Sequence, residues 1–316
     1  MINAFSKSIK KLGIVRILSA LRHFRRLRKN DPLYKKYGIK KKPWQSLSYN
    51  SIAEHSDDFP WMDQPVTTAM IQSMPLYKSF DNGIQQQVLQ WPEKGLILLP
   101  QFFKREEIDK TEQSITGGLT EKNKQKYFSN RLINLHKTNK LVNSLFRDID
   151  LQKLLSFVLG KEALPYQTIN FYKSSSQLAH SDSLHLTTEP LGYLIGVWIA
   201  LEDVVPGSGE FFYYPGSHKF KYLMNKDFDA KNNSWSLDVR LNEKYEDKVA
   251  QVIQENQLKP ETFLPKKGDV IIWHANLLHG SHPKKDISLT RKSLVMHYFA
   301  KGVLCYHESM ERPVVF

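Results

Sequence analysis

The sequence predicts a mainly β domain with flanking helices (α+β), built around a jelly-roll core. Beyond Pro165 the hydrophobic pattern takes the short period of strands, in β-branched and aromatic runs bounded by Gly, Pro or Asp. A series of such strands is typical of a jelly-roll sandwich. With 316 residues, 41% of them hydrophobic, the chain can bury one sizeable core but is too short for three independent domains.

Helical and extended segments precede the strands. Residues 43–94 carry Pro and aromatic residues without a clear period, which predicts a connector that wraps over the domain. A buried strand is predicted at 95–100. Helices are predicted at 84–91, from Lys104 onward, and as one stretch at 141–159 that ends at Gly160.

The strands of the predicted core fall at 166–172, 193–201, 210–214, 269–273 and 293–299. An insertion at 220–262 separates the third strand from the fourth. It holds a helix signal from Asn242 to Gln257 and almost no strand signal. An insertion of that size at the mouth of a site is usually a lid or a substrate-binding element. The expected division is therefore an arm at 1–42, the connector at 43–94 and a catalytic domain at 95–316.

The formal net charge of +13 comes from the first 42 residues, which hold 14 basic residues against Asp31 alone. The rest of the chain carries 31 residues of each sign and is neutral. In a helical projection of residues 2–29 most basic residues lie opposite an apolar side, a pattern that Arg16 and Leu18 interrupt. That apolar side is formed by Ile2, Phe5, Ile9, Leu12 and Leu27.

A basic amphipathic arm predicts docking to an anionic membrane surface, at about 1 kcal/mol per Lys or Arg near the lipid. Packing against a partner or against the domain, a targeting peptide, and a nucleic-acid contact remain open. Nucleic acid is not the expected substrate, because the neutral remainder has no basic and aromatic stripe.

Cysteine usage and hydropathy bound the location. The single Cys305 excludes an intramolecular disulfide and favours a reducing compartment. No apolar run approaches the ~20 residues of a membrane span, and Arg16 interrupts the longest run near the N-terminus. The expected location is cytoplasmic, peripheral on the inner face of a membrane.

His180 and Asp182 are the strongest candidates for metal ligands. Residues two apart in a strand project to the same face, so this pair could grip one ion while a second, distant His closes the triangle. Two imidazoles and one carboxylate with open positions form the ligand set of non-haem Fe(II) oxygenases. The candidates for the second His are His279, His185, His274 and His282, whereas His218 in a Pro-Gly-Ser-His turn is expected to be structural.

With these residues in place, the chain resembles the phytanoyl-CoA dioxygenase family of Fe(II)/2-oxoglutarate-dependent oxygenases, from about Gly95 to Tyr306. The resemblance implies a double-stranded β-helix, cupin-like core. The motifs that carry it are His180-Ser-Asp182, Val197-Trp-Ile-Ala-Leu-Glu-Asp203, Tyr214-Pro-Gly-Ser-His218, Lys267-Gly-Asp269, His279-Gly-Ser281 and Arg291-Lys-Ser293.

The resemblance also implies roles for particular residues. Catalytic iron would be held by His180, Asp182 and His279. Arg291 would pair with the outer carboxylate of 2-oxoglutarate through its planar fork. Further contacts to the cosubstrate pocket are expected from Ser281, Asn170 and Trp198. Fe(II), 2-oxoglutarate and O₂ are the implied cofactor and cosubstrates, with ascorbate a candidate reductant.

The carboxylate at Asp182 favours hydroxylation over halogenation, since halogenating relatives have a small residue there. The family acts on acyl-CoA thioesters, amino-acid derivatives and natural products, so no substrate transfers with the resemblance. The basic arm suggests a small-molecule, lipid-linked or glycan-type substrate near a membrane. The alternatives are a catalytically silent cupin-like scaffold and a non-oxygenase cupin metalloenzyme, and neither needs an anchor such as Arg291.

Overall fold

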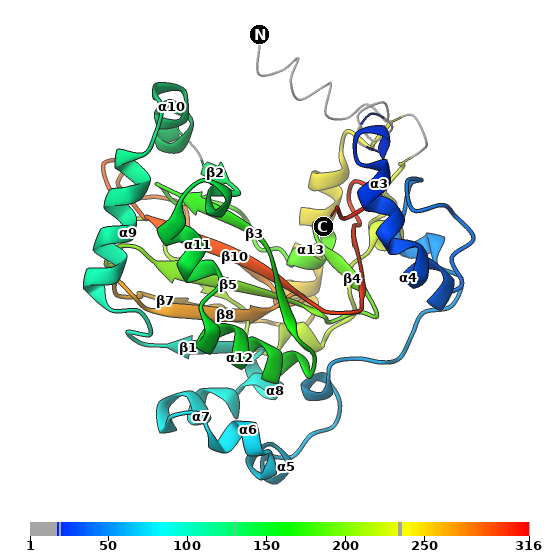
Figure 1. Ribbon diagram of the computed structural model, residues 1–316, viewed down its shortest axis with the longest axis horizontal. Helices are drawn as coiled ribbons and strands as arrows, with labels where there is room; N and C mark the ends of the chain where they lie inside the picture. The colour runs from blue at the N-terminus through cyan, green and yellow to red at the C-terminus, as the bar shows by residue number, and fades with distance from the viewer. Residues whose placement is uncertain (1–17, 19, 130, 233–235, 316) are drawn as a thin grey trace.

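The computed structural model describes residues 18, 20–129, 131–232 and 236–315, and its strands form three antiparallel sheets (Figure 1). The strands are β1 (Leu96–Leu99), β2 (Arg131–Ile133), β3 (Ala163–Phe171), β4 (Thr187–Glu189), β5 (Leu194–Ala200), β6 (Phe211–Tyr213), β7 (Glu261–Phe263), β8 (Val270–His274), β9 (His279–Ser281), β10 (Ser293–Ala300), β11 (Leu304–His307) and β12 (Arg312–Pro313).

The major sheet has the order β1-β8-β5-β10-β3-β2, and the minor sheets have the orders β12-β11-β4 and β7-β6-β9. Every residue of β5 and β8 is buried, as expected for central strands covered on both faces. The predicted jelly-roll core with flanking helices is confirmed.

Helices cover one face of the major sheet. The α-helices are α3 (Phe24–Leu27), α4 (Asp31–Lys36), α5 (Thr68–Ser73), α6 (Pro75–Lys78), α7 (Asn82–Val88), α8 (Trp91–Lys94), α9 (Arg105–Gly117), α10 (Glu121–Ser129), α11 (Lys140–Phe146), α12 (Ile149–Leu159) and α13 (Leu241–Glu255). Figure 1 shows α9, α11 and α12 in front of the sheet, where their apolar residues share one core with the even-numbered residues of β10. The opposite face of the sheet lines a cavity.

The single helix predicted at 141–159 is wrong, because the chain forms α11 and α12 with a break at Arg147 and Asp148. The Asp148 side chain accepts a hydrogen bond from the backbone N–H of Leu151 at 2.8 Å and caps a new helix. Gly160 ends α12 in the left-handed conformation at φ 68°, as predicted. Asp148 stands inside a continuous apolar period, so the sequence pattern does not reveal the break between the two helices.

The five predicted core strands are observed as β3, β5, β6, β8 and β10, and the strand predicted at 95–100 as β1. The strands that were not predicted are β2, β4, β7, β9, β11 and β12. These have two to four residues each, which is too short to show a period.

The predicted helix of the 220–262 segment is α13. It buries Tyr245 against the loop that carries the His180-Ser-Asp182 motif, where the Tyr245 hydroxyl accepts a hydrogen bond from the Ser181 N–H at 2.8 Å. Leu184 and Leu278 join the same apolar cluster. The segment therefore buttresses the motif loop from outside.

Residues 43–94 run irregularly along the domain, with α5 to α8 in their second half, and make contacts with distant parts of the chain. The Tyr49 N–H donates to Glu308 Oε2 at 2.7 Å, and the Trp61 indole donates to the Phe157 carbonyl at 2.6 Å. These contacts agree with the expected wrap, although the domain division itself stays a prediction.

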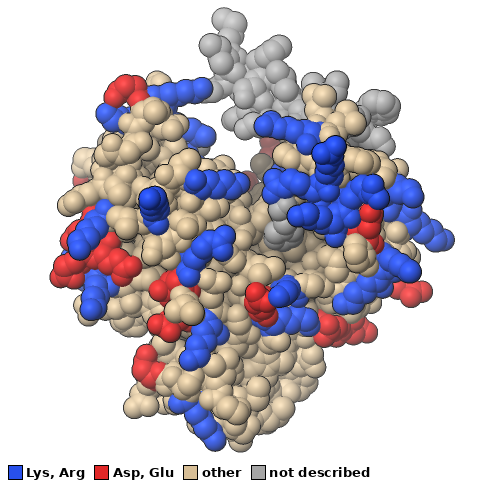
Figure 2. Space-filling model, in the orientation of Figure 1, with Lys and Arg blue, Asp and Glu red and all other residues tan. Residues whose placement is uncertain are grey.

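Residues 1–17 and 19 of the predicted amphipathic arm lie outside the described residues, and of its apolar side only Leu27 is described, 3% exposed. Tyr34, Tyr37 and Ile39 pack against Tyr306 of β11, so the later part of the arm belongs to the folded body. Figure 2 shows Lys and Arg gathered over α3 and α4. In the part of the chain that is described, no helix is long and apolar enough to cross a bilayer.

Candidate metal centre

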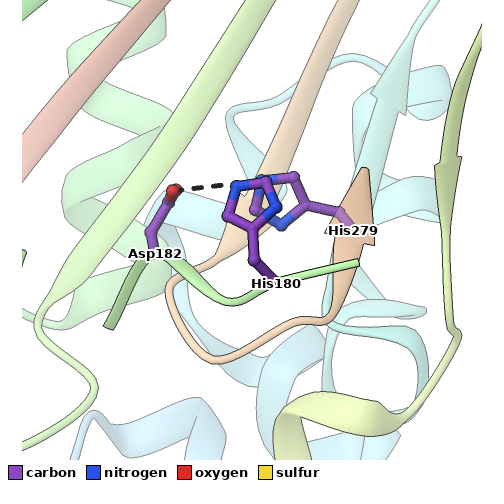
Figure 3. Close-up of side chains that lie close together, drawn as sticks. All are labelled: His180, Asp182 and His279. Carbon is purple, nitrogen blue, oxygen red and sulfur yellow. Dashed lines mark ion pairs between the residues drawn. The ribbon is translucent and has the colours of Figure 1, made fainter. Parts of the chain in front are cut away.

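Figure 3 shows His180, Asp182 and His279 pointing toward one another, and one ligand atom from each lies within 4.8 Å of the others. His180 and His279 are directly opposite partners in an antiparallel bridge, with N···O distances of 3.0 and 2.9 Å. Their rings are 4.5 Å apart. The bridge thus carries both imidazoles on one face.

The assumption that His180 and Asp182 share a strand is wrong. His180 lies in an isolated bridge outside the named strands, and Asp182 begins the 3-10 turn Asp182–Leu184. The turn brings the carboxylate back beside the imidazoles, which a strand would have done by alternation. The three side chains meet by a different local route.

Both imidazoles are held in the tautomer that suits a metal. His180 Nδ1 lies 2.8 Å from the Leu178 carbonyl and His279 Nδ1 lies 2.9 Å from the Leu277 carbonyl. A carbonyl only accepts, so each Nδ1 carries the proton and donates it. Each Nε2 is then unprotonated, faces the cluster and can bind a metal through its lone pair.

Burial keeps these imidazoles neutral. It lowers the pKa of His180 to about 3, with a further contribution from His279, and it lowers the pKa of His279 as well. Metal ligands must be deprotonated to bind. Two neutral imidazoles and a carboxylate at this spacing fit a divalent transition metal, with iron one candidate.

Asp182 is held by residues behind the cluster. Its Oδ2 accepts a hydrogen bond from the Trp273 indole at 2.8 Å and lies 3.4 Å from His297 Nε2, while Oδ1 faces His279 Nε2 at 3.9 Å. Burial alone would raise the pKa of this carboxyl, but the hydrogen bond from His297 and the neighbouring imidazoles outweigh it and hold the pKa well below its usual range. Asp182 is therefore an oriented carboxylate with one oxygen directed at the cluster.

A glycine makes room for that indole. Gly196 of β5 is paired with Trp273 of β8, and a Cβ at Gly196 would lie 2.1 Å from the Trp273 ring. Only glycine lets the indole cross the neighbouring strand and reach Asp182.

Arg291 is 3% exposed and lines the same cavity. One of its Nη atoms donates to Ser281 Oγ at 3.1 Å, while its Nε is buried without a partner. No carboxylate of the described residues forms an ion pair with it. Burial lowers the pKa of the guanidinium to about 10, so it remains a cation at neutral pH. A buried, unpaired cation that faces a cavity calls for an anion.

Of the three further contacts predicted for the cosubstrate, Ser281 and Trp198 lie beside Arg291. The Trp198 ring is 5.7 Å from the Arg291 guanidinium carbon, and both residues line the cavity. The placement of Asn170 is wrong. Asn170 is completely buried opposite Leu294 and Leu132, which face the helix-covered core. Alternate residues of a strand point to opposite faces, so its neighbours on β3 line the cavity and Asn170 does not.

The competing histidines lie elsewhere. His274 is buried and pairs with Asp63 at 3.0 Å beside a different cavity, and His282 contacts Thr262 Oγ1 at 2.8 Å. His185 lines the cavity, with its ring 6.4 Å from that of His180, but it is outside the ligand cluster. His218 packs against Gly95 in its turn, as a structural residue would.

The cavity has a volume of about 420 Å³, in the range of small-molecule sites. Sequence reasoning missed the residues that stand behind Asp182 in this cavity, namely Trp273, His297 and Gln167. Gln167 Nε2 lies 3.1 Å from His297 Nδ1 and continues the chain of contacts to Asp182. Two signals could have found the first two: a glycine inside a strand marks a close approach, and His297 lies an even number of residues after Arg291, which precedes β10 by two residues.

The model of the phytanoyl-CoA dioxygenase (PhyH) family matches residues 91–288. Phytanoyl-CoA dioxygenase domain-containing protein 1 of Danio rerio is 32% identical over 106 residues, 32% of this chain and 32% of that protein. The match therefore spans about a third of that curated relative.

Solved structures share the fold. The non-heme alpha ketoglutarate dependent carbocyclase SnoK from nogalamycin biosynthesis has a TM-score of 0.56 at 16% identity, covering 76% of this chain and 89% of its own. EctD from S. alaskensis, solved with 2-oxoglutarate and 5-hydroxyectoine, has a TM-score of 0.53 at 18% identity, covering 72% and 81%. The family match extends over more than half of the sequence and includes the ligand cluster, so this chain belongs to the phytanoyl-CoA dioxygenase (PhyH) family.

Proposed function

We propose that the protein is an Fe(II)/2-oxoglutarate-dependent dioxygenase that hydroxylates a small-molecule, lipid-linked or glycan-type substrate. The observation that carries the proposal is the buried guanidinium of Arg291, which opens without a carboxylate partner into the cavity that holds His180, Asp182 and His279. A metallohydrolase or an isomerase would need the cluster but not this anchor. A silent scaffold would need neither.

The relatives support the same chemistry. SnoK is an alpha ketoglutarate dependent non-heme enzyme by its title, and EctD has been solved with 2-oxoglutarate and also with bound Fe. When bound, iron with 2-oxoglutarate and O₂ would supply the oxidising chemistry, with succinate and CO₂ as coproducts and ascorbate as a candidate reductant.

The chain's own residues bind and orient the reactants. The Nε2 atoms of His180 and His279 and Oδ1 of Asp182 would hold the iron, leaving positions open for the cosubstrate. Arg291 would bind the far carboxylate of 2-oxoglutarate, with Ser281 orienting the guanidinium by the 3.1 Å contact. Trp198 and Phe211 wall the cavity, and they would exclude water from the reacting centre.

A titration and a turnover assay test this function. Anaerobic addition of Fe(II) and 2-oxoglutarate should give the metal-to-ligand charge-transfer absorption of the chelate in wild type, and a weaker band in Arg291→Ala. Asp182→Ala should abolish succinate production. Bound iron without any band would favour the non-oxygenase cupin or the scaffold.

The proposed location is the cytoplasmic face of an anionic membrane, reached through the basic arm. Leu18 and Leu21 are 59% and 69% exposed beside Arg22 and Arg25, and Figure 2 shows the basic surface over α3 and α4. Exposed apolar side chains among cations are what interfacial helices present to lipid.

A liposome co-sedimentation test should remove residues 1–17 and mutate Leu18 and Leu21 to Ser, since removal of all 42 residues would strip Tyr34 and Tyr37 from the core. Loss of binding to anionic vesicles, with retained binding in the wild type, is expected. Equal binding of both proteins would contradict the membrane role and turn attention to a protein partner.

A further inference from the structure

Beyond the metal centre, the same cavity contains two more arginines. Arg131 comes from β2, at the edge of the major sheet, and Arg312 comes from β12, at the edge of a minor sheet. Arg131 and Ile133 face the cavity while Leu132 between them packs into the core. Figure 2 shows the surface hollowed between the part that bears α10 and the part that bears α3, with basic side chains on both rims.

Neither arginine has an acidic partner among the described residues. Arg312 Nε is buried without a hydrogen bond, and burial lowers the pKa of its guanidinium, with only the Tyr166 phenol opposing that effect. The Arg131 guanidinium carbon lies 5.9 Å from the Phe171 ring. Asp182 is the only carboxylate among the described residues that line the cavity, and it belongs to the ligand cluster.

Neutral polar groups stand beside these cations. His307 is the register partner of Arg312, so their side chains emerge next to each other. His307 Nδ1 donates to the His185 carbonyl at 2.7 Å, which leaves Nε2 of His307 as an acceptor or a contact to a bound group. His185, His307 and Gln167 all line the cavity. They can orient a ligand without changing its charge.

The charges of the occupied site can be counted on the basis of the proposed function. Fe(II) and Asp182 together contribute +1, Arg291 contributes +1 and 2-oxoglutarate contributes −2, so the catalytic half is neutral. Arg131 and Arg312 then remain as two cations that no carboxylate among the described lining residues balances. Cations in such a place are expected to bind an anion, and the guanidinium fork matches carboxylate and phosphate oxygens.

We propose that the substrate carries an anionic group, a carboxylate or a phosphate, that Arg131 and Arg312 bind inside this cavity. Apolar side chains make up much of the remaining lining, namely Ile169, Phe171, Leu186, Val295 and Met310. The substrate is therefore an acid with an apolar body that these side chains contact. This inference rests on the proposed function, since 2-oxoglutarate is what neutralises Arg291.

The test uses the full chain loaded with Mn(II), a redox-inert substitute for iron, and saturated with 2-oxoglutarate. Calorimetric titrations then compare benzyl phosphate, phenylacetate and the neutral benzyl alcohol. The presence of 2-oxoglutarate keeps the probes from Arg291. Binding of either anion is expected, while benzyl alcohol binds at least tenfold more weakly. The two anionic probes distinguish a phosphate site from a carboxylate site.

Arg131→Gln and Arg312→Gln should each weaken the anionic probe about tenfold or more, because each loses a charge-assisted hydrogen bond, and should change 2-oxoglutarate affinity by less than threefold. Arg147→Gln is the matched control, an exposed arginine between α11 and α12, and should change neither. Melting temperatures check that all three variants fold.

The inference is overturned if neither anion binds wild type, if benzyl alcohol binds equally well, or if both Gln variants bind the anions normally. It is also overturned if Arg131→Gln weakens 2-oxoglutarate as much as it weakens the probe, because Arg131 would then belong to the cosubstrate site. Failure of the wild type to bind 2-oxoglutarate would instead contradict the proposed function. Arginine-dependent anion binding in that case would still support the anion site.

Discussion

Replacement of Arg291 by Met should stabilise the ligand-free protein while it abolishes the response to 2-oxoglutarate. Arg291 is 3% exposed and forms no ion pair with a described carboxylate, and burial lowers the pKa of its guanidinium to about 10, well below its ordinary value. One pKa unit corresponds to about 1.36 kcal/mol, so the buried charge costs roughly 3 kcal/mol. Methionine keeps the unbranched stem and removes the charge, and replacements of buried charges by apolar residues are often stabilising by about 1–4 kcal/mol.

The expected size of the effect follows from the chain length. At about 2.1 cal/mol/K per residue, 316 residues unfold with an entropy of roughly 0.66 kcal/mol/K, so about 3 kcal/mol raises the melting temperature by ~4–5 °C. Any loss of packing reduces that gain. In wild type with Mn(II), 2-oxoglutarate at 100 times its Kd adds about 2.7 kcal/mol, or ~4 °C.

Differential scanning fluorimetry with and without 2-oxoglutarate measures both effects on one protein. The Met variant should melt at a higher temperature than wild type without 2-oxoglutarate. Its shift with 2-oxoglutarate should be ~1 °C or less, because loss of one partner of a buried charge pair weakens binding by roughly 2–5 kcal/mol, at least about 30-fold. A variant that melts lower than wild type and still shifts by ~4 °C would refute both the unpaired charge and the anchor.

Three further outcomes are expected. Gly196→Ala should displace the Trp273 indole from Asp182 and weaken Mn(II) binding about 10- to 100-fold, measured by electron paramagnetic resonance. Unchanged Mn(II) affinity would mean that the hydrogen bond from the indole does not orient Asp182 for metal binding. Asn170→Leu removes a buried amide that has no hydrogen-bond partner among the described residues, so it should raise the free energy of unfolding by about 1–2 kcal/mol. The affinity for 2-oxoglutarate should not change. Weaker binding of 2-oxoglutarate would mean that Asn170 contacts the cosubstrate. Burial lowers the pKa of His218 to about 3, so below about pH 6.5 the unfolded chain binds more protons than the folded one, and the free energy of unfolding decreases as the pH decreases. His218→Gln should remove about 2 kcal/mol of the stability that wild type loses between pH 7 and pH 5, measured by urea titration. Equal losses in both proteins would contradict this account.

The sequence predicted the residue types of the site better than their local geometry. A His, an Asp and a distant His with an Arg define a chemistry, and those side chains do meet in the cavity. The route was wrong, since Asp182 lies in a 3-10 turn and not in a strand. Asn170 was misplaced because a resemblance assigns a position but not the face of a strand. The parity of β3 would have excluded it.

Contacts that depend on tertiary register were beyond local patterns. Trp273 reaches Asp182 only because its register partner is Gly196, on a strand that is distant in sequence. Arg312 joins the cavity through a two-residue strand, which no period could reveal. The position of the basic arm follows from amino-acid composition alone. The residues that the arm packs against do not, and the packing of Tyr34 and Tyr37 on Tyr306 was not predicted.

Strand β10 shows why the fold and the site constrain each other. Leu294, Met296 and Tyr298 pack into the core on its helix-covered face, and Val295 and His297 face the cavity on the other. A slip of one residue would exchange the two sets, sending the His297 imidazole into the apolar core and the leucine toward the metal ligands. The cost of burying polar groups in that core therefore fixes the register. The same register places His297 behind Asp182, so the apolar core that stabilises the sheet also orients the carboxylate of the metal centre.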